Sequence, residues 1–137
     1  MTEASTGTPE TAANGKGKGK LLIVADLFLF AKLREGAISL GYEATGAGNI
    51  DIARKKLAEE QFLAVLLSFN KDGFDWEGLL AHVRSTPETR ELPVLAFGSH
   101  VDTAAFKRAK ELGADMVAPN SQIASDFPYV LTSLLEY

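Results

Sequence analysis

Two groups of residues in this chain are of types that could do covalent chemistry. Ser99, His100 and Asp102 supply a nucleophile, a base and an acid within four positions, whereas Asp26 and Ser68 each end a short apolar run. A catalytic triad is defined by geometry, and its members converge from separate elements of structure. Residues this close in sequence rarely converge in that way. We therefore expect Asp102 to cap a helix and the chain not to be an enzyme.

Metal and cofactor chemistry has little support in the residue types. There is no cysteine, and the two histidines, His82 and His100, fall in different expected elements. This composition excludes a disulfide framework, a thiolate nucleophile and a cysteine-based zinc or iron–sulfur site. The glycine-rich turn at 46–49 follows the second expected strand and matches neither the dinucleotide fingerprint nor a P-loop. We expect no metal and no cofactor.

The composition of the 137-residue chain also bounds its partners. A net charge of -4 and a pI near 5.2 argue against nucleic acid, whose phosphates require clustered Lys and Arg. No apolar run approaches the ~18 residues that a membrane span needs. Residues 1–19 contain no large hydrophobe after Met1, so we expect a disordered leader and a cytoplasmic protein.

Short apolar runs and segments of helical spacing alternate from residue 20 onward. The apolar runs and weaker strand signals lie at 21–25, 42–45, 62–67, 92–97 and 115–118. Segments with helical spacing, caps or breakers lie at 27–40, 49–60, 75–84, 102–112 and 125–136. We expect Phe28 and Phe30 in the first helix, with Phe69, Phe74 and Trp76, to serve core and loop packing.

This alternation predicts an α/β fold. Strands separated by helices form βαβ units, whose right-handed crossovers give a parallel sheet covered on both faces. Five such units over residues 20–137 fit a flavodoxin-like, three-layer (βα)5 sandwich with strand order 2-1-3-4-5. Ligands of such sheets bind beyond the carboxyl ends of the strands, at the switch point between strands 1 and 3. Asp26 and Ser68 are the polar residues expected there.

Four stretches of the chain carry a family resemblance. They are Ile23–Asp26, Asp72–Leu80, Leu92–Leu95 and Ala109–Asp115. In order and spacing they resemble the end of strand 1, the Asp-Gly loop with the third helix, the entry to strand 4 and the close of the fourth helix of response-regulator receiver domains. The resemblance covers residues 20–137 and implies the same fold.

The resemblance also implies a set of chemical positions. Receivers transfer a phosphoryl group to an aspartate after strand 3, with Mg²⁺ held by acidic side chains and with a hydroxyl and a lysine on strands 4 and 5. Magnesium needs several oxygen ligands, and the carboxylate is the nucleophile. The residues of this chain at those positions are Asp26 beside Ala25, Ser68 as the acceptor, Gly98 or Ser99 for the hydroxyl, and Asn120 or Ala118 for the lysine.

Two functions remain open at this point. We expect a pseudo-receiver: a non-catalytic signalling module that lacks aspartyl phosphorylation and works through protein–protein interaction, with Ser68 satisfying backbone groups. The alternative is a regulatory domain that binds a small polar ligand in the altered pocket at the carboxyl ends of the strands. For the first, the resemblance suggests a protein partner on a face with Lys107, Arg108, Lys110 and Tyr129, and a monomer or weak dimer.

Overall fold

The computed structural model describes residues 18–136, so most of the expected leader lies outside the described part of the chain. Of that leader, Lys18 and Gly19 contact the domain: the Lys18 ammonium lies over the Tyr42 ring, and the Gly19 carbonyl accepts a hydrogen bond from Glu43. The strands are β1 Lys20–Val24, β2 Glu43–Gly46, β3 Ala64–Ser68, β4 Val94–Gly98 and β5 Met116–Pro119. The helices are α1 Leu27–Ser39, α2 Ile50–Glu59, α3 Trp76–Ser85, α4 Thr103–Glu111, α5 Asn120–Ser125 and α6 Phe127–Leu135.

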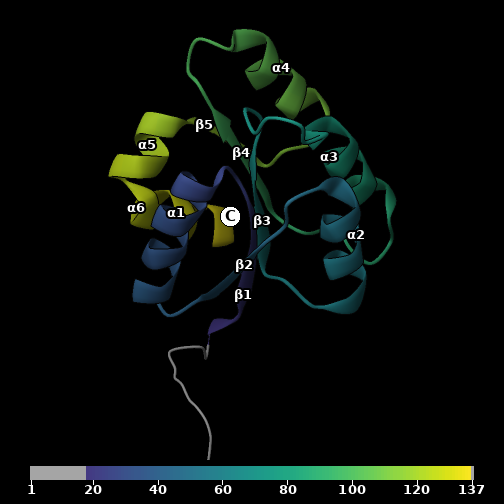
Figure 1. The fold of residues 1–137 in the computed structure, drawn as a ribbon, viewed down its shortest axis with the longest axis horizontal. Helices are drawn as coiled ribbons and strands as arrows, with labels where there is room; N and C mark the ends of the chain where they lie inside the picture. Colours follow the sequence, from purple (N-terminus) through teal and green to yellow (C-terminus); the bar gives the residue numbers. More distant parts are fainter. Residues whose placement is uncertain (1–17, 137) are drawn as a thin grey trace, which may run out of the picture.

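The five strands form one parallel sheet in the order β2-β1-β3-β4-β5, which confirms the predicted topology. Figure 1 shows α1, α5 and α6 on one side of the sheet and α2 and α3 on the other, with α4 beyond α3. The register pairs Ser68 with Phe97, and Gly98 with Pro119. The carboxyl ends of the strands therefore meet along one edge, at the top of Figure 1.

The central strands are apolar on both faces because each face is covered by helices. Leu21, Ile23 and Phe97 point toward α1 and α6, and belong to one buried cluster. Leu22 and Val65 point the other way, toward α2 and α3, in a second cluster. Each such side chain contributes roughly 1.5–3 kcal/mol on full burial. The two clusters hold the sheet rigid, so the loops at its carboxyl edge have fixed starting points.

Helix boundaries follow local capping chemistry. Asp26, Asn49, Asp75 and Asp102 each accept a hydrogen bond from a backbone N–H three residues on, as N-caps do, and the caps predicted at 49 and 102 are confirmed. Gly41 adopts a φ of 96° after α1, a left-handed conformation that costs glycine little. The capping residues thus place the start of each of these helices close to the carboxyl edge.

Two features of the helices differ from the expectations. The last helix is present as α6, which begins at Phe127, but an unexpected short helix, α5, precedes it and ends at Ser125, and Asp126 between them leaves the helical region at φ -141° and ψ 36°. Pro128 lies in the first turn of α6, where its missing N–H costs nothing. The second difference concerns Phe28, which is 82% exposed on α1 instead of packed.

Within residues 18–136, no helix combines the length and the apolar character needed to cross a bilayer.

Candidate functional site

Asp26 leaves the carboxyl end of β1 and turns toward its own helix. Its Oδ1 accepts a hydrogen bond from the Leu29 N–H at 2.9 Å, which makes it the N-cap of α1, and the side chain is exposed. Its neighbour Ala25 is buried. The carboxylate is therefore committed to a local capping role at the N-terminus of α1, where negative charge is favoured.

Ser68 is the last residue of β3 and is only 4% exposed. Its Oγ accepts a hydrogen bond from the Asn70 N–H at 3.1 Å. This contact confirms the prediction that Ser68 satisfies a backbone group where the chain leaves the strand. The hydroxyl oxygen is thus held by the β3–α3 loop that it helps to shape.

Asn70 connects two loops that lie apart in the sequence. Its Oδ1 accepts a hydrogen bond from the Ser99 N–H, and its Nδ2 lies 3.5 Å from Oδ2 of Asp102. Asp102 in turn caps α4 by accepting from the Ala105 N–H at 3.1 Å. One amide side chain therefore ties the β3–α3 loop to the start of α4. The sequence does not predict this role, because a single asparagine in a loop does not indicate a hydrogen bond to Ser99, 29 residues away.

Phe69 fills the space above the end of β4. A Cβ atom placed on Gly98 would lie under 3.0 Å from the Phe69 ring and from Oδ1 of Asn70. The Phe69 ring is itself held by Trp76 and Phe106, with ring centroids 5.8 and 5.3 Å away. Position 98 therefore requires glycine, because the Phe69 ring occupies the space that a side chain would need.

The two candidates for the lysine position lie on either side of Pro119. Ala118 is a buried residue of β5 paired with Phe97, whereas Asn120 is the first residue of α5. The alignment based on Pro119 therefore keeps the lysine position of receivers on β5 and places it at Ala118. Asn120 holds its Oδ1 buried without a hydrogen-bond partner among the described atoms. Neither side chain can supply an ammonium group at this edge.

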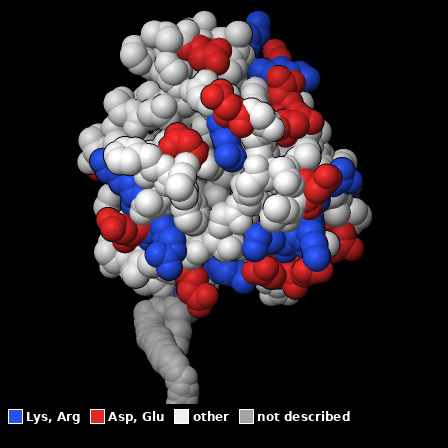
Figure 2. Space-filling view, in the orientation of Figure 1, with Lys and Arg blue, Asp and Glu red and all other residues white. Residues whose placement is uncertain are grey.

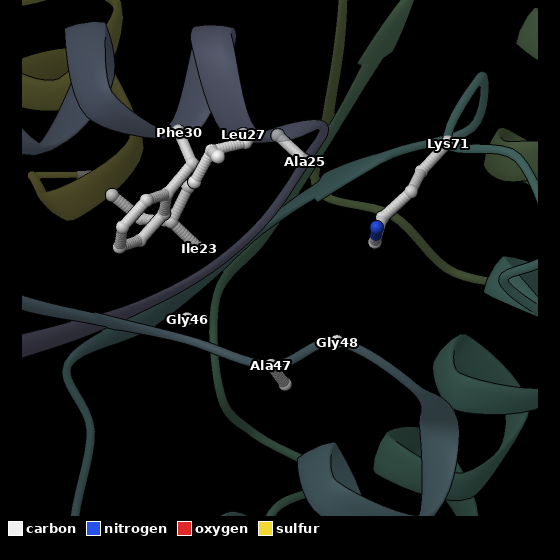
Figure 3. Close-up of a pocket in the computed structure, with 8 residues that line it drawn as sticks. All are labelled: Ile23, Ala25, Leu27, Phe30, Gly46, Ala47, Gly48 and Lys71. Carbon is white, nitrogen blue, oxygen red and sulfur yellow. The ribbon is translucent and has the colours of Figure 1, made fainter.

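A pocket of 240 Å³ opens beside the ends of β1 and β2. Its lining is largely apolar and consists of Ile23, Ala25, Leu27, Phe30, Gly46, Ala47, Gly48 and Lys71. Figure 3 shows the Lys71 amine reaching in from the β3–α3 loop, toward Gly48 and across from Phe30. Lys71 was not among the expected pocket residues, which were Asp26, Ser68, Ser99 and Asn120. None of those four lines this pocket.

The triad residue types do not assemble into a triad. Ser99 Oγ accepts from the Val101 N–H at 3.4 Å, Asp102 is engaged by α4 and by Asn70, and His100 is exposed. No hydrogen bond joins the His100 ring to either of the other two within residues 18–136. Across the same residues, no three His, Cys, Asp or Glu side chains gather closely enough to hold a metal ion.

The suggested partner face is divided between two layers of the molecule. Lys107, Arg108 and Lys110 are exposed on α4, where Arg108 pairs with Glu77 of α3 at 3.1 Å and with Glu111 at 3.7 Å. Tyr129 is 63% exposed on α6, on the opposite face of the sheet. A partner that contacts all four side chains would have to span edge strand β5. Figure 2 shows acidic and basic side chains interspersed over the face it displays.

Comparison with known proteins places this architecture in a family. No family model matches the sequence. The chain is 32% identical over 102 residues to a Rhizobium etli protein named "Probable chemotaxis protein CheY", covering 73% of this chain and 79% of that protein.

Solved structures agree with this relationship at the level of the fold. A Chloroflexus aurantiacus protein assigned as a response regulator superposes with a TM-score of 0.76 at 25% identity, over 86% of this chain and 98% of that one. The Vibrio cholerae chemotaxis protein CheY4 gives a TM-score of 0.76 at 18% identity, over 85% and 98% of the two chains. With its strand order 2-1-3-4-5 and a relative above 30% identity over most of that relative's length, this chain belongs to the response-regulator receiver domain family.

Proposed function

We propose that this chain is a non-catalytic receiver module that acts by binding a protein partner and is not controlled by aspartyl phosphorylation. The observation that supports this most is Ser68 at the end of β3, where the family carries the phosphoryl acceptor. A serine hydroxyl is a weak nucleophile without an adjacent base. Here its Oγ is also occupied as an acceptor for the Asn70 N–H.

The donor set does not fit the Mg²⁺ ion that receiver chemistry uses. Mg²⁺ requires near-octahedral oxygen ligation, usually with one or two carboxylates from the protein. The carboxylate that follows β1, Asp26, caps α1, and its neighbour is Ala25, so the pair of adjacent acids that receivers place there is missing. The Lys71 amine reaches into the neighbouring pocket and adds a positive charge on the same side of the sheet. We therefore derive no step through a metal.

The groups that would report phosphorylation are also replaced. Gly98 offers no hydroxyl and Ala118 no amine, so a phosphoryl group would find neither partner. In their place Asn70 joins the β3–α3 loop to Ser99 and Asp102 through hydrogen bonds internal to the protein. The side chain of Asn70 thereby helps to hold the start of α4 in place. The exposed face of α4 would then be available to a partner without prior phosphorylation.

A phosphodonor experiment tests this proposal directly. The protein is incubated with Mg²⁺ and acetyl phosphate, then with Mg²⁺ and beryllofluoride, and followed by intact mass and by amide NMR spectra. A receiver domain that retains its aspartate serves as the positive control. We expect an unchanged mass and unchanged amide shifts. A phosphorylated species, or shifts centred on Ser68 and Ala118 at stoichiometric beryllofluoride, would refute the proposal.

Variants of the exposed charges test the partner. The native protein is used to capture binding proteins, and the capture is repeated with Lys107→Glu/Lys110→Glu and with Tyr129→Ala. Lys32→Glu on α1 is the matched control, because it changes an exposed lysine elsewhere. We expect the α4 variant to lose a partner that the control retains. Equal capture by all variants would remove α4 and Tyr129 from the interface.

The 240 Å³ pocket supports a second candidate function, the binding of a small regulatory ligand. Its apolar walls and single ammonium group fit a small molecule with an apolar body and one anionic end. A thermal-shift screen of short-chain carboxylates would reveal a stabilising compound, and Lys71→Met would cancel its effect. Lys32→Met is the control. Retention of the shift in the Lys71 variant would place the ligand elsewhere.

A further inference from the structure

A second hollow lies away from the carboxyl edge, between α2 and α3. This cleft has a volume of 570 Å³. It is lined by Arg54, Lys55, Leu57, Ala58, His82, Thr86, Glu88 and Thr89. Helix α2 supplies the first four residues, whereas the others come from α3 and the segment that follows it. The cleft therefore joins two helices that belong to one layer of the fold.

Three basic side chains face this cleft. Arg54 and Lys55 project from α2 and are exposed, and neither forms an ion pair with any residue from 18 to 136. His82 comes from α3 on the other side and is half-buried. Glu88 is the one acid in the lining. Figure 2 shows basic and acidic atoms side by side over the position of α2.

The surroundings of His82 show that the basic groups act on one another. Burial lowers the pKa of the His82 ring, and the nearby Arg54 charge lowers it further. The ring also lies 3.4 Å from Oγ1 of Thr86. Like charges gathered in a cleft repel each other, and an anion placed between them would reverse that effect by favouring the protonated ring.

Two carbonyl groups in the last turn of α3 already have hydrogen-bond donors within the protein. Such groups carry partial negative charge and usually repel anions. The His82 carbonyl accepts a hydrogen bond from Thr86 Oγ1 at 2.7 Å, and the Val83 carbonyl accepts from Thr89 Oγ1 at 2.8 Å. Both acceptors are satisfied internally, and the basic donors that line the cleft are the Arg54 guanidinium, the Lys55 ammonium and the His82 ring.

We propose that the α2–α3 cleft is a binding site for a small phosphomonoester. The planar Arg54 fork matches phosphate oxygens, Lys55 adds a point charge, and the His82 ring supplies a third donor from the facing helix. Leu57 and Ala58 form an apolar wall for the organic part of the ligand. The bound molecule would bridge α2 and α3, and this site is separate from both the carboxyl edge and the exposed face of α4.

Titration of the full chain with two probes tests the proposal. Inorganic phosphate and adenosine monophosphate are added at constant ionic strength, with sodium chloride as the reference salt, and amide and His82 ring signals are followed. We expect saturable shifts confined to α2 and α3, and a higher His82 pKa with phosphate present. Tighter binding of the nucleotide would show that the apolar wall is used. Shifts that track ionic strength, or an unchanged His82 pKa, would overturn the site.

Matched variants separate this site from general charge effects. Arg54→Gln should weaken phosphate binding about tenfold, the effect of losing a charge-assisted hydrogen bond. Glu88→Gln removes the one acid of the lining and should strengthen binding. Lys107→Gln, which removes an exposed positive charge on α4, should leave it unchanged. Because all three side chains are exposed, these variants should fold, as the amide spectrum would confirm. Equal affinity in Arg54→Gln and the parent would refute the proposal.

Discussion

The two ends of the sheet hold their loops in different ways. At the carboxyl edge, Ser68, Asn70 and Ser99 are linked by hydrogen bonds between neutral groups, and one carboxylate, that of Asp102, contacts Asn70 at 3.5 Å without a basic partner in this cluster. At the amino ends of β4 and β5, a charged pair does the same work: Arg84 Nη2 lies 2.7 Å from Oδ2 of Asp115. Both clusters join loops that are distant in sequence. They differ in that only the second is built around an ion pair.

The Arg84 cluster is the more extensive of the two. The guanidinium also donates to the carbonyls of Gly113 at 2.9 Å and Leu92 at 2.7 Å, and Asp115 accepts from the Val94 N–H at 2.8 Å. In a receiver the carboxyl edge is where charge is concentrated for chemistry. In this chain the ion pair that forms several further hydrogen bonds lies at the opposite end of the sheet, where it holds the loops in place. The charged cluster and the positions that receivers use for phosphoryl transfer are therefore at separate edges of the sheet.

The largest effect is expected from breaking the charged cluster. Arg84→Ala would remove the donors to Gly113 and Leu92 and leave Asp115 without its partner. The two charged side chains are only 22% and 28% exposed, so we expect a loss of about 3 kcal/mol in the free energy of unfolding. Urea denaturation measures it. Arg34→Ala, on the exposed side of α1, is the control, and a loss as small as the control's would show that the cluster contributes little.

Gly98→Ser tests whether the carboxyl edge has been closed by packing. The new Cβ would collide with the Phe69 ring, which Trp76 and Phe106 hold in place. Overpacking of this kind costs about 1–3 kcal/mol in unfolding free energy. The matched control is Gly48→Ser, where a Cβ would meet nothing within 4 Å. If the two serine variants were equally stable by denaturation, the edge would have room for a side chain after all.

Asn70→Ala tests the neutral cluster, with a smaller expected effect. Its loss leaves the Ser99 N–H without an acceptor, at a cost of about 1 kcal/mol. Amide hydrogen exchange at Ser99 should become faster. Asn120→Ala is the informative contrast, because Asn120 Oδ1 has no partner among the described atoms and its removal should cost nothing. An unchanged exchange rate at Ser99 would show that the Asn70 side chain does not hold the start of α4 in place.

The smallest effect is a pH dependence at His82, which adjoins neither cluster. Its pKa in the folded state lies below the ordinary value of 6.5. As the pH falls below 6.5, the unfolded chain therefore takes up this proton before the folded chain does, and stability falls. Denaturation at a series of pH values should show a smaller loss below 6.5 in His82→Gln than in the parent. A parallel decline in both would mean that the His82 ring does not set the dependence.

Sequence patterns predicted the fold because its signals are local. The apolar runs, the caps at Asn49 and Asp102, and the glycine after α1 all act within a few residues of themselves. Ser68 and Gly98 were found because the spacing of the strands aligned them with receiver positions. Helix α5 was not predicted, since it has only 6 residues and no side-chain N-cap.

The rest of the site depends on contacts that leave no local pattern. Asn70 meets Ser99, Phe69 covers Gly98, and Lys71 reaches a pocket formed by the first two strands. All three residues lie in one short loop whose direction is decided by tertiary packing. Composition identifies such residues as polar, aromatic or basic, but only the folded chain says what they contact.

The aromatic ring above Gly98 has a consequence for how this protein could change over generations. Exchanging Ser68 for aspartate would place a new negative charge at a position that is only 4% exposed, beside a strand β4 that ends in Gly98 without a hydroxyl. A hydroxyl at position 98 would first require a smaller residue at 69, whose ring is packed against Trp76 and Phe106. A side chain at position 98 and the aromatic ring at position 69 are therefore coupled, so that a change at one requires a change at the other.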